Sequence, residues 1–159
     1  NSGYQAVLGL LSCIPQKTDL VLYDQYSHSS IMDGIRLGSA THYKFSHRDV
    51  ENLSEQIQRH IKNFENIYVV VESVFSFSGD TSPLLEIAEL CSNHKNIFLI
   101  VDEAQGVGVF GKQGRGLCNA LNIEHLCFAR IFTYSKALGC SGASVVGSNA
   151  LKNYLVKTF

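Results

Sequence analysis

The chain alternates between short apolar runs, which predict strands, and longer stretches with helical periodicity. A strand that is apolar at consecutive positions is typical of a sheet buried on both faces. Residues 41–45 alternate in character instead, and this pattern also predicts a strand. The predicted strands span residues 19–23, 41–45, 67–71, 97–101, 128–133 and 143–146.

Helices are predicted where apolar residues recur three or four positions apart. Val50, Leu53 and Ile57, for example, fall on one face of a helix over residues 50–61. Further helices are predicted over residues 3–11, 31–37, 83–91 and 149–158. Strands that alternate with helices predict an α/β fold of three layers, αβα, around a mostly parallel sheet. Because no linker or internal repeat interrupts the pattern, we expect one domain.

Composition and charge narrow the class of protein. With 159 residues, 45% hydrophobic and 17% charged, the chain can bury a substantial core. A net charge of -1 provides no basic field for nucleic acid, and no apolar run reaches the ~20 residues of a spanning helix. The five scattered cysteines lack a C-x-x-C pair, which favours reduced thiols in the cytoplasm over disulfides or a zinc site.

A lysine follows the predicted strand at 128–133, within the segment Thr-Tyr-Ser-Lys-Ala-Leu-Gly at 133–139. One interpretation is that the stem of Lys136 packs while its head reaches solvent, and for a single lysine this is the better one. The other is that the free amine attacks a carbonyl group. Asp102 also follows a predicted strand, and ligands of open α/β sheets bind at strand ends.

Asp102 has three possible roles in such a position. It can cap the following turn, bind a metal, or pair with an organic cation. A metal needs several ligands, and only Glu103 is close in sequence, so we expect no metal site. A protonated ring nitrogen would satisfy a buried carboxylate with a single partner.

Two further positions, considered together with the lysine and the aspartate, indicate the kind of ligand that the site would bind. His28 lies between a strand and a helix, where a histidine usually makes local hydrogen bonds but can also stack on an aromatic ligand. Gly3 begins a helix, which is either an ordinary capped start or an anion site that Ser135 could complete. Together these residues fit a flat, anionic, aldehyde-bearing ligand, namely pyridoxal 5′-phosphate (PLP).

The segment from Gly106 to Gly111 matches the dinucleotide pattern G-x-G-x-x-G. In a dinucleotide site the first glycine turns directly from strand to helix, whereas residues 102–105 intervene here. Gly114 and Gly116 also interrupt any helix that follows. A flexible loop is therefore the favoured interpretation, and a nucleotide-binding oxidoreductase is kept as an alternative.

Six motifs in this order resemble the α-oxoamine synthase family of fold-type I PLP enzymes, over nearly the whole chain. They are Ser-Gly-Tyr at 2–4, Ser-His-Ser-Ser at 27–30, Glu-Ser-Val-Phe-Ser at 72–76 with Gly79-Asp80, Val-Asp-Glu-Ala at 101–104, Gly-Arg-Gly at 114–116 and Thr-Tyr-Ser-Lys-Ala-Leu-Gly at 133–139. The resemblance implies a C-acyltransferase that condenses an amino acid with an acyl thioester and releases CO2. The sequence is most similar to members that use L-alanine and a pimeloyl thioester in biotin biosynthesis. Members that form 2-amino-3-oxobutyrate, 5-aminolevulinate or 3-ketosphinganine remain alternatives.

The resemblance also implies roles for single residues. Lys136 would condense with the cofactor aldehyde and move protons at the substrate Cα, and Asp102 would keep the ring nitrogen protonated. His28 would stack on the ring. The remaining cofactor contacts would be Ser76 near the ring hydroxyl, and Thr133, Ser135 and the backbone of Gly3 and Tyr4 at the phosphate.

One position departs from the family pattern. Members usually carry histidine where this chain has Gln105, and that histidine is expected to bond the ring oxygen and the substrate carbonyl. Glutamine can donate a hydrogen bond but cannot act as a general acid. We therefore expect altered activity or substrate handling, and a scaffold that has lost catalysis is a third hypothesis.

The resemblance covers the large, PLP-binding domain of the family. We expect residues 1–159 to be a fragment of that domain, without the N-terminal segment and the C-terminal domain that carries a substrate-binding arginine. Members place the cofactor site at a homodimer interface. The chain alone is therefore expected to be inactive.

Overall fold

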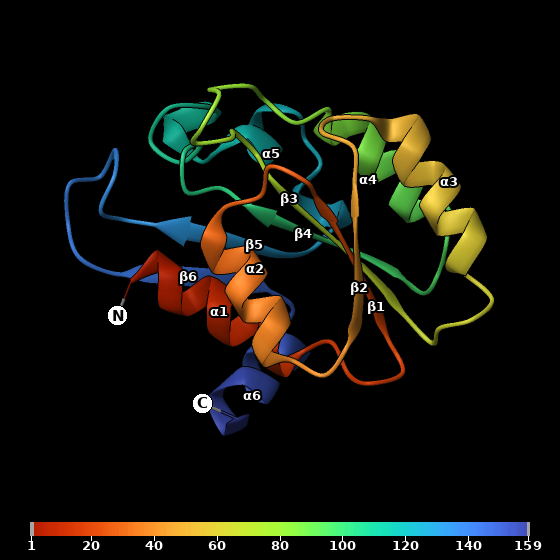
Figure 1. Cartoon of the computed structure of the whole chain (residues 1–159). Coiled ribbons are helices and arrows are strands. Elements are labelled where there is room, and N and C mark those ends of the chain that lie inside the picture. Colours follow the sequence, from red (N-terminus) through yellow and green to blue (C-terminus); the bar gives the residue numbers. More distant parts are fainter. Residues whose placement is uncertain (1, 159) are drawn as a thin grey trace.

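A single six-stranded sheet runs through the molecule in the computed structural model, which describes residues 2–158 (Figure 1). The strands are β1 (Leu20–Asp24), β2 (Thr41–Phe45), β3 (Ile67–Glu72), β4 (Ile97–Asp102), β5 (Cys127–Thr133) and β6 (Ala143–Gly147). Their order is β2-β1-β3-β4-β5-β6, and every neighbouring pair is parallel except β5 and β6. The predicted α/β fold with a mostly parallel sheet is therefore confirmed.

Helices cover both faces of the sheet (Figure 1). The helices are α1 (Gly3–Cys13), α2 (Ser29–Leu37), α3 (Val50–His60), α4 (Leu84–Ser92), α5 (Leu117–Ala120) and α6 (Asn149–Thr158), with short 3-10 turns at Lys112–Gly114 and Glu124–Leu126. Leu20 and Leu22 of β1 point to the core beneath α3, α4 and α5. Val21 points to the core beneath α1, α2 and α6. This alternation gives the three predicted layers.

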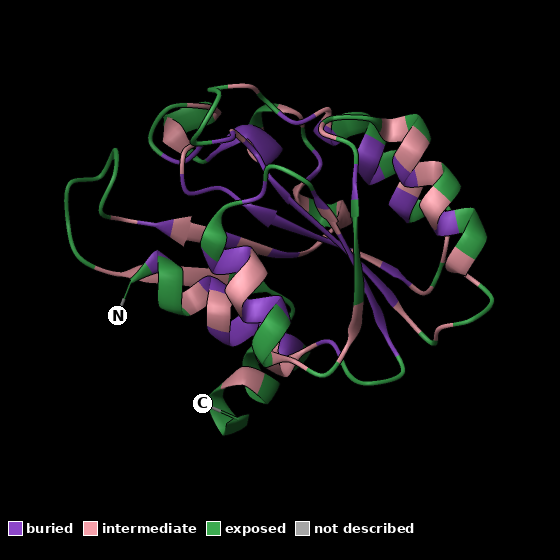
Figure 2. Ribbon diagram, in the orientation of Figure 1, coloured by how far each residue is buried: buried purple, intermediate pink, exposed green. Residues whose placement is uncertain are grey.

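The central strands β1, β3 and β4 are almost entirely buried, as Figure 2 shows. All six residues of β3 are buried. The run of consecutive apolar residues in this strand predicted burial on both faces. Because β1, β3, β4 and β5 are parallel, their carboxyl ends meet at one edge of the sheet. The loops after these ends carry the residues singled out in the sequence.

Element boundaries differ from the predictions by one residue in several places. β1 begins at Leu20 because the side chain of Asp19 accepts hydrogen bonds from the backbone N–H of Gln16 (2.8 Å) and from Nδ2 of Asn66 (2.9 Å). Strands β3 and β4 each run one residue further than predicted, through Glu72 and Asp102. These two residues are register partners, so their side chains lie next to each other on one face of the sheet.

No helix within residues 2–158 combines the length and the apolar character that a bilayer-spanning segment needs.

Candidate active site

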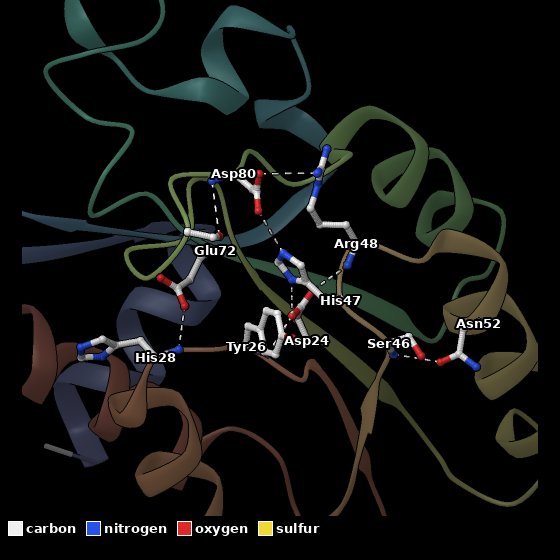
Figure 3. Close-up of polar contacts among 10 residues, drawn as sticks. Asp24, Tyr26, His28, Ser46, His47, Arg48, Asn52, Glu72 and Asp80 are labelled. Carbon is white, nitrogen blue, oxygen red and sulfur yellow. Dashed lines mark hydrogen bonds and ion pairs between the residues drawn. The ribbon is translucent and has the colours of Figure 1, made fainter.

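Four charged side chains gather where the loops after β1, β3, β4 and β5 meet. They are His28, Glu72, Asp102 and Lys136. The backbone N–H of His28 donates to Oε1 of Glu72 at 2.6 Å, as Figure 3 shows. Lys136 and the His28 ring both lie close enough to Asp102 to lower its pKa. The sheet thus brings the predicted amine, carboxylate and imidazole to one place.

Asp102 is a buried carboxylate with one backbone partner. Its Oδ1 accepts the N–H of Ala104 at 2.9 Å, so the side chain also caps the turn that follows β4. Within residues 2–158, no salt bridge involves this side chain. Burial raises the pKa of Asp102, and the Ala104 N–H, the charge of Lys136 and the His28 ring oppose this shift. The site therefore holds a carboxylate that a cationic ligand would stabilise.

His28 is the N-cap of α2 and its ring is held in place by local contacts. Nδ1 accepts the backbone N–H of Ser30 at 3.2 Å and lies 2.9 Å from Oγ of the same residue. The rings of Tyr4 and His28 are nearly perpendicular, with centroids 6.1 Å apart at an interplanar angle of 78°. The local hydrogen-bonding role is therefore present, and it fixes the orientation of a ring at the candidate site.

Lys136 is exposed in the loop between β5 and β6. Backbone bonds from Tyr134 N–H to Gly142 O and from Cys140 N–H to Tyr134 O, both 3.0 Å, hold this loop. The positive charge of Lys136 lowers the pKa of both Glu72 and Asp102. The amine thus reaches solvent while it remains within electrostatic range of two buried carboxyl groups.

The N-terminus of α1 packs directly on the end of β5. A Cβ atom on Gly3 would lie 1.8 Å from Oγ1 of Thr133, so only glycine fits at this contact. Ser2 caps the helix by accepting the N–H of Gln5 at 3.3 Å. Ser135 follows Thr133 and is exposed. Hydroxyl groups and the amino end of a helix therefore lie close together, which is an arrangement that suits a phosphate group.

The two other predicted contacts lie on neighbouring loops. Ser76 is exposed in the loop that joins β3 to α4, and its backbone N–H bonds to the carboxyl group of Glu72. Gln105 is half-buried in the first turn after β4, three residues beyond Asp102. Both positions flank the buried carboxyl groups.

Two features of this edge were not predicted from the sequence. The first is Glu72, which is buried and whose carboxyl group has a pKa raised by burial to about 7. The available signal was its position at the end of a β-branched run, the same signal that singled out Asp102. Its partners could not be found in this way, because His28 lies 44 residues away along the chain.

The second feature is a polar cluster of Asp24, His47, Arg48 and Asp80 (Figure 3). Nδ1 of His47 lies 2.9 Å from Oδ1 of buried Asp24, and its Nε2 lies 3.5 Å from Asp80. Asp24 also accepts the backbone N–H of Arg48 at 2.9 Å. This cluster ties the turn before α3 to the loop after β3, which carries Ser76.

The glycine-rich segment is closed by its own backbone and by Glu103. The N–H of Gly108 donates to Gly114 O at 2.7 Å, and the buried carboxylate of Glu103 accepts the N–H groups of Leu117 (3.0 Å) and Cys118 (2.7 Å). A dinucleotide would need those helix N–H groups for its pyrophosphate. The carboxylate occupies them, so this geometry argues against the oxidoreductase alternative.

In the part of the chain that the structure describes, no three His, Cys, Asp or Glu side chains are grouped as metal ligands.

Comparisons with known proteins cover almost the entire chain. The family model for aminotransferase class I and II matches residues 1–158. The chain is 39% identical over 158 residues to the 8-amino-7-oxononanoate synthase of Chlorobaculum parvum, a match that covers 99% of this chain and 40% of that protein.

Two solved structures extend this similarity to the fold. A serine palmitoyltransferase from S. paucimobilis, solved with bound PLP and myriocin, has a TM-score of 0.91 at 34% identity and covers 98% of this chain and 39% of that one. An 8-amino-7-oxononanoate synthase from Francisella tularensis has a TM-score of 0.85 at 33% identity and covers 98% and 44%, respectively. The chain therefore spans about two fifths of the length of these relatives.

Proposed function

We propose, because this chain belongs to the aminotransferase class I and II family, that it carries the cofactor site of a PLP-dependent C-acyltransferase. The single observation that carries the proposal is the grouping of Lys136, Asp102 and His28 at one sheet edge. A serine palmitoyltransferase with 34% identity was solved with PLP bound, which supports the same cofactor here.

The residues present fit this cofactor. Asp102 is buried and forms no salt bridge within residues 2–158, and a protonated ring nitrogen would supply a close cationic partner. Gly3 lets the amino end of α1 pack directly on Thr133, which brings backbone N–H groups and a hydroxyl group together as partners for a phosphate. The exposed amine of Lys136 is free to meet an aldehyde.

When bound, PLP supplies an aldehyde that condenses with amines and a ring that accepts the electrons of a carbanion. In our proposal Lys136 would hold the cofactor covalently until the amino group of the substrate displaces it, and the released Lys136 amine would then move a proton at the substrate Cα. Asp102 holds a proton at the ring nitrogen, and His28 packs on the ring face. The ring hydroxyl is bonded by Ser76 and by the side-chain amide of Gln105. The phosphate is bound by Thr133, Ser135 and the backbone of Gly3 and Tyr4.

For the substrates we propose L-alanine and a pimeloyl thioester, which are condensed with loss of CO2 in biotin biosynthesis. The name of the Chlorobaculum parvum relative supports this choice. The similarity to serine palmitoyltransferase supports an alternative pair of substrates, namely serine and a thioester with a longer acyl chain. Because one methylene changes discrimination by only about 1–3 kcal/mol, acyl length has to be measured.

We further propose that the active form is a homodimer in the cytoplasm. Exposed apolar side chains on three loops at this sheet edge, Phe77, Val109 and Leu138, support burial against a second copy. The five free cysteines support a reducing compartment.

Borohydride reduction of the full-length protein that contains this chain, followed by peptide mass spectrometry, tests the proposed function. The mass of the reduced cofactor should be found on the peptide that contains Lys136. Turnover of alanine, glycine and serine with a panel of acyl thioesters then identifies the substrates. Absence of a cofactor adduct, or an adduct on a different lysine, would contradict the proposal.

Replacing Gln105 with histidine is expected to raise turnover by at least about tenfold, since an imidazole adds a general acid that an amide lacks. The pH profile of turnover should gain a limb near pH 6–7. Gln105→Leu is the matched control, because it removes the hydrogen-bond donor and should lower turnover. Equal rates for Gln105→His and the parent protein would show that the position does not affect the rate-limiting step.

A further inference from the structure

Glu72 is buried at the carboxyl end of β3. On one side lies β1, whose following loop carries His28, and on the other side lies β4, which ends at Asp102. The mechanism above gives its side chain no task. A buried carboxyl group is costly unless it has hydrogen-bond partners. Its partners are the backbone N–H of His28, 2.6 Å from Oε1, and the backbone N–H of Ser76 (Figure 3 shows the first).

We propose that Glu72 is a positioning residue, which fixes His28 and the Ser76 loop around the cofactor by bonding their backbone N–H groups. The inference rests on the proposed function, in which His28 contacts the ring face and Ser76 the ring hydroxyl. These residues belong to separate loops, and no sequence neighbour links them. One carboxyl group between them sets their spacing.

The same carboxyl group is coupled electrostatically to Asp102, its register partner on β4. Burial raises the pKa of Glu72 to about 7. The His28 N–H lowers it, the Asp102 charge raises it, and the Ser76 N–H and the Lys136 charge lower it. A cationic ring nitrogen beside Asp102 offsets the charge that Asp102 exerts. Cofactor binding should therefore release a proton from Glu72, and affinity should rise with pH through about pH 7.

Absorbance titration of the cofactor-free full-length protein with PLP between pH 6 and pH 8 tests the inference. Glu72→Ala removes the carboxyl group that accepts the backbone N–H groups of His28 and Ser76, so we expect its Kd to rise about 10- to 100-fold. The circular dichroism of the bound cofactor should weaken as well, because the His28 ring is no longer fixed. Glu72→Gln keeps an acceptor oxygen for the His28 N–H. It should retain affinity within about threefold at pH 6, while the pH dependence attributed to Glu72 disappears.

Asp24→Asn is the matched control. Asp24 is also a buried carboxylate at this edge, but it bonds the N–H groups of Tyr26 (2.8 Å) and Arg48 (2.9 Å) instead of His28. This substitution should leave the pH dependence of PLP affinity as in the parent protein. A change equal to that of Glu72→Gln would show that any neutralised carboxylate at the edge has the same effect, and would overturn the inference.

The inference is also overturned if Glu72→Gln titrates like the parent protein at every pH and keeps its pH dependence. If Glu72→Ala does not fold, Glu72→Gln decides alone, because it preserves the hydrogen-bond acceptor. Failure of the proposed function gives a different result. In that case the parent protein itself forms no borohydride-reducible adduct.

Discussion

In the full-length protein, Lys136→Ala is expected to lower turnover at least about 10³-fold and to leave no borohydride-stable cofactor. Lys136 is exposed, yet its charge acts on both Glu72 and Asp102. A ligand that enters the site can therefore contact the Lys136 amine and the buried carboxyl groups at the same time. Without this amine the cofactor has no covalent attachment and the Cα proton has no acceptor in the proposed mechanism.

The matched control for this prediction is Lys112→Ala. Lys112 is an exposed lysine in the glycine-rich segment, and it has no place in the proposed site. This variant should keep both turnover and the reducible adduct. If Lys136→Ala loses turnover but still carries the adduct, the covalent link belongs to a different lysine and the assignment is wrong.

The fold was predictable because the sheet is buried on both faces. Continuous apolar runs such as that of β3 occur only where helices cover both sides, and this gave the number and direction of the central strands. The predicted strand ends were one residue short at Glu72 and Asp102. Charged residues are typical of loops, but in this sheet they complete the strands and line the site.

The family resemblance could be predicted because its motifs lie at strand ends and helix starts, which the apolar pattern locates. Five of the six motifs extend beyond strand ends or helix starts into the loops at one sheet edge. The chain's membership in the aminotransferase class I and II family and its similarity to 8-amino-7-oxononanoate synthase and serine palmitoyltransferase confirm that prediction.

The contacts that organise the site could not be predicted, because they join residues far apart in the chain. The Glu72 bond to His28 spans 44 residues, and the His47 bond to Asp24 spans 23. Periodicity carries no information on such pairs. The role of Glu103 was also missed: the sequence allowed a flexible glycine loop, whereas the buried carboxylate fixes that loop from within.

Asp102→Asn is expected to separate stability from catalysis. Asparagine keeps an oxygen that can accept the Ala104 N–H, so the turn after β4 should be retained. The negative charge that pairs with the ring nitrogen is lost, and turnover should fall at least about 100-fold, since each pKa unit of such pairing corresponds to about 1.4 kcal/mol. Stability of the cofactor-free protein should not fall, because burial raises the pKa of Asp102 and the charged form is costly.

The pH dependence of stability provides a second test of Asp102→Asn. A carboxyl group with a raised pKa in the folded state contributes full stability below its unfolded pKa, and this contribution is lost as pH rises through the folded value. Urea unfolding of the cofactor-free parent protein should therefore show stability that falls as pH rises, and Asp102→Asn should reduce that slope. Asp19→Asn is the control: it neutralises a buried carboxylate at the opposite edge of the sheet and should lower stability while turnover per folded molecule is kept. An Asp102→Asn protein with undiminished turnover would remove the carboxylate from the cofactor site and, with it, the reason for placing a cationic ring between Asp102 and Lys136.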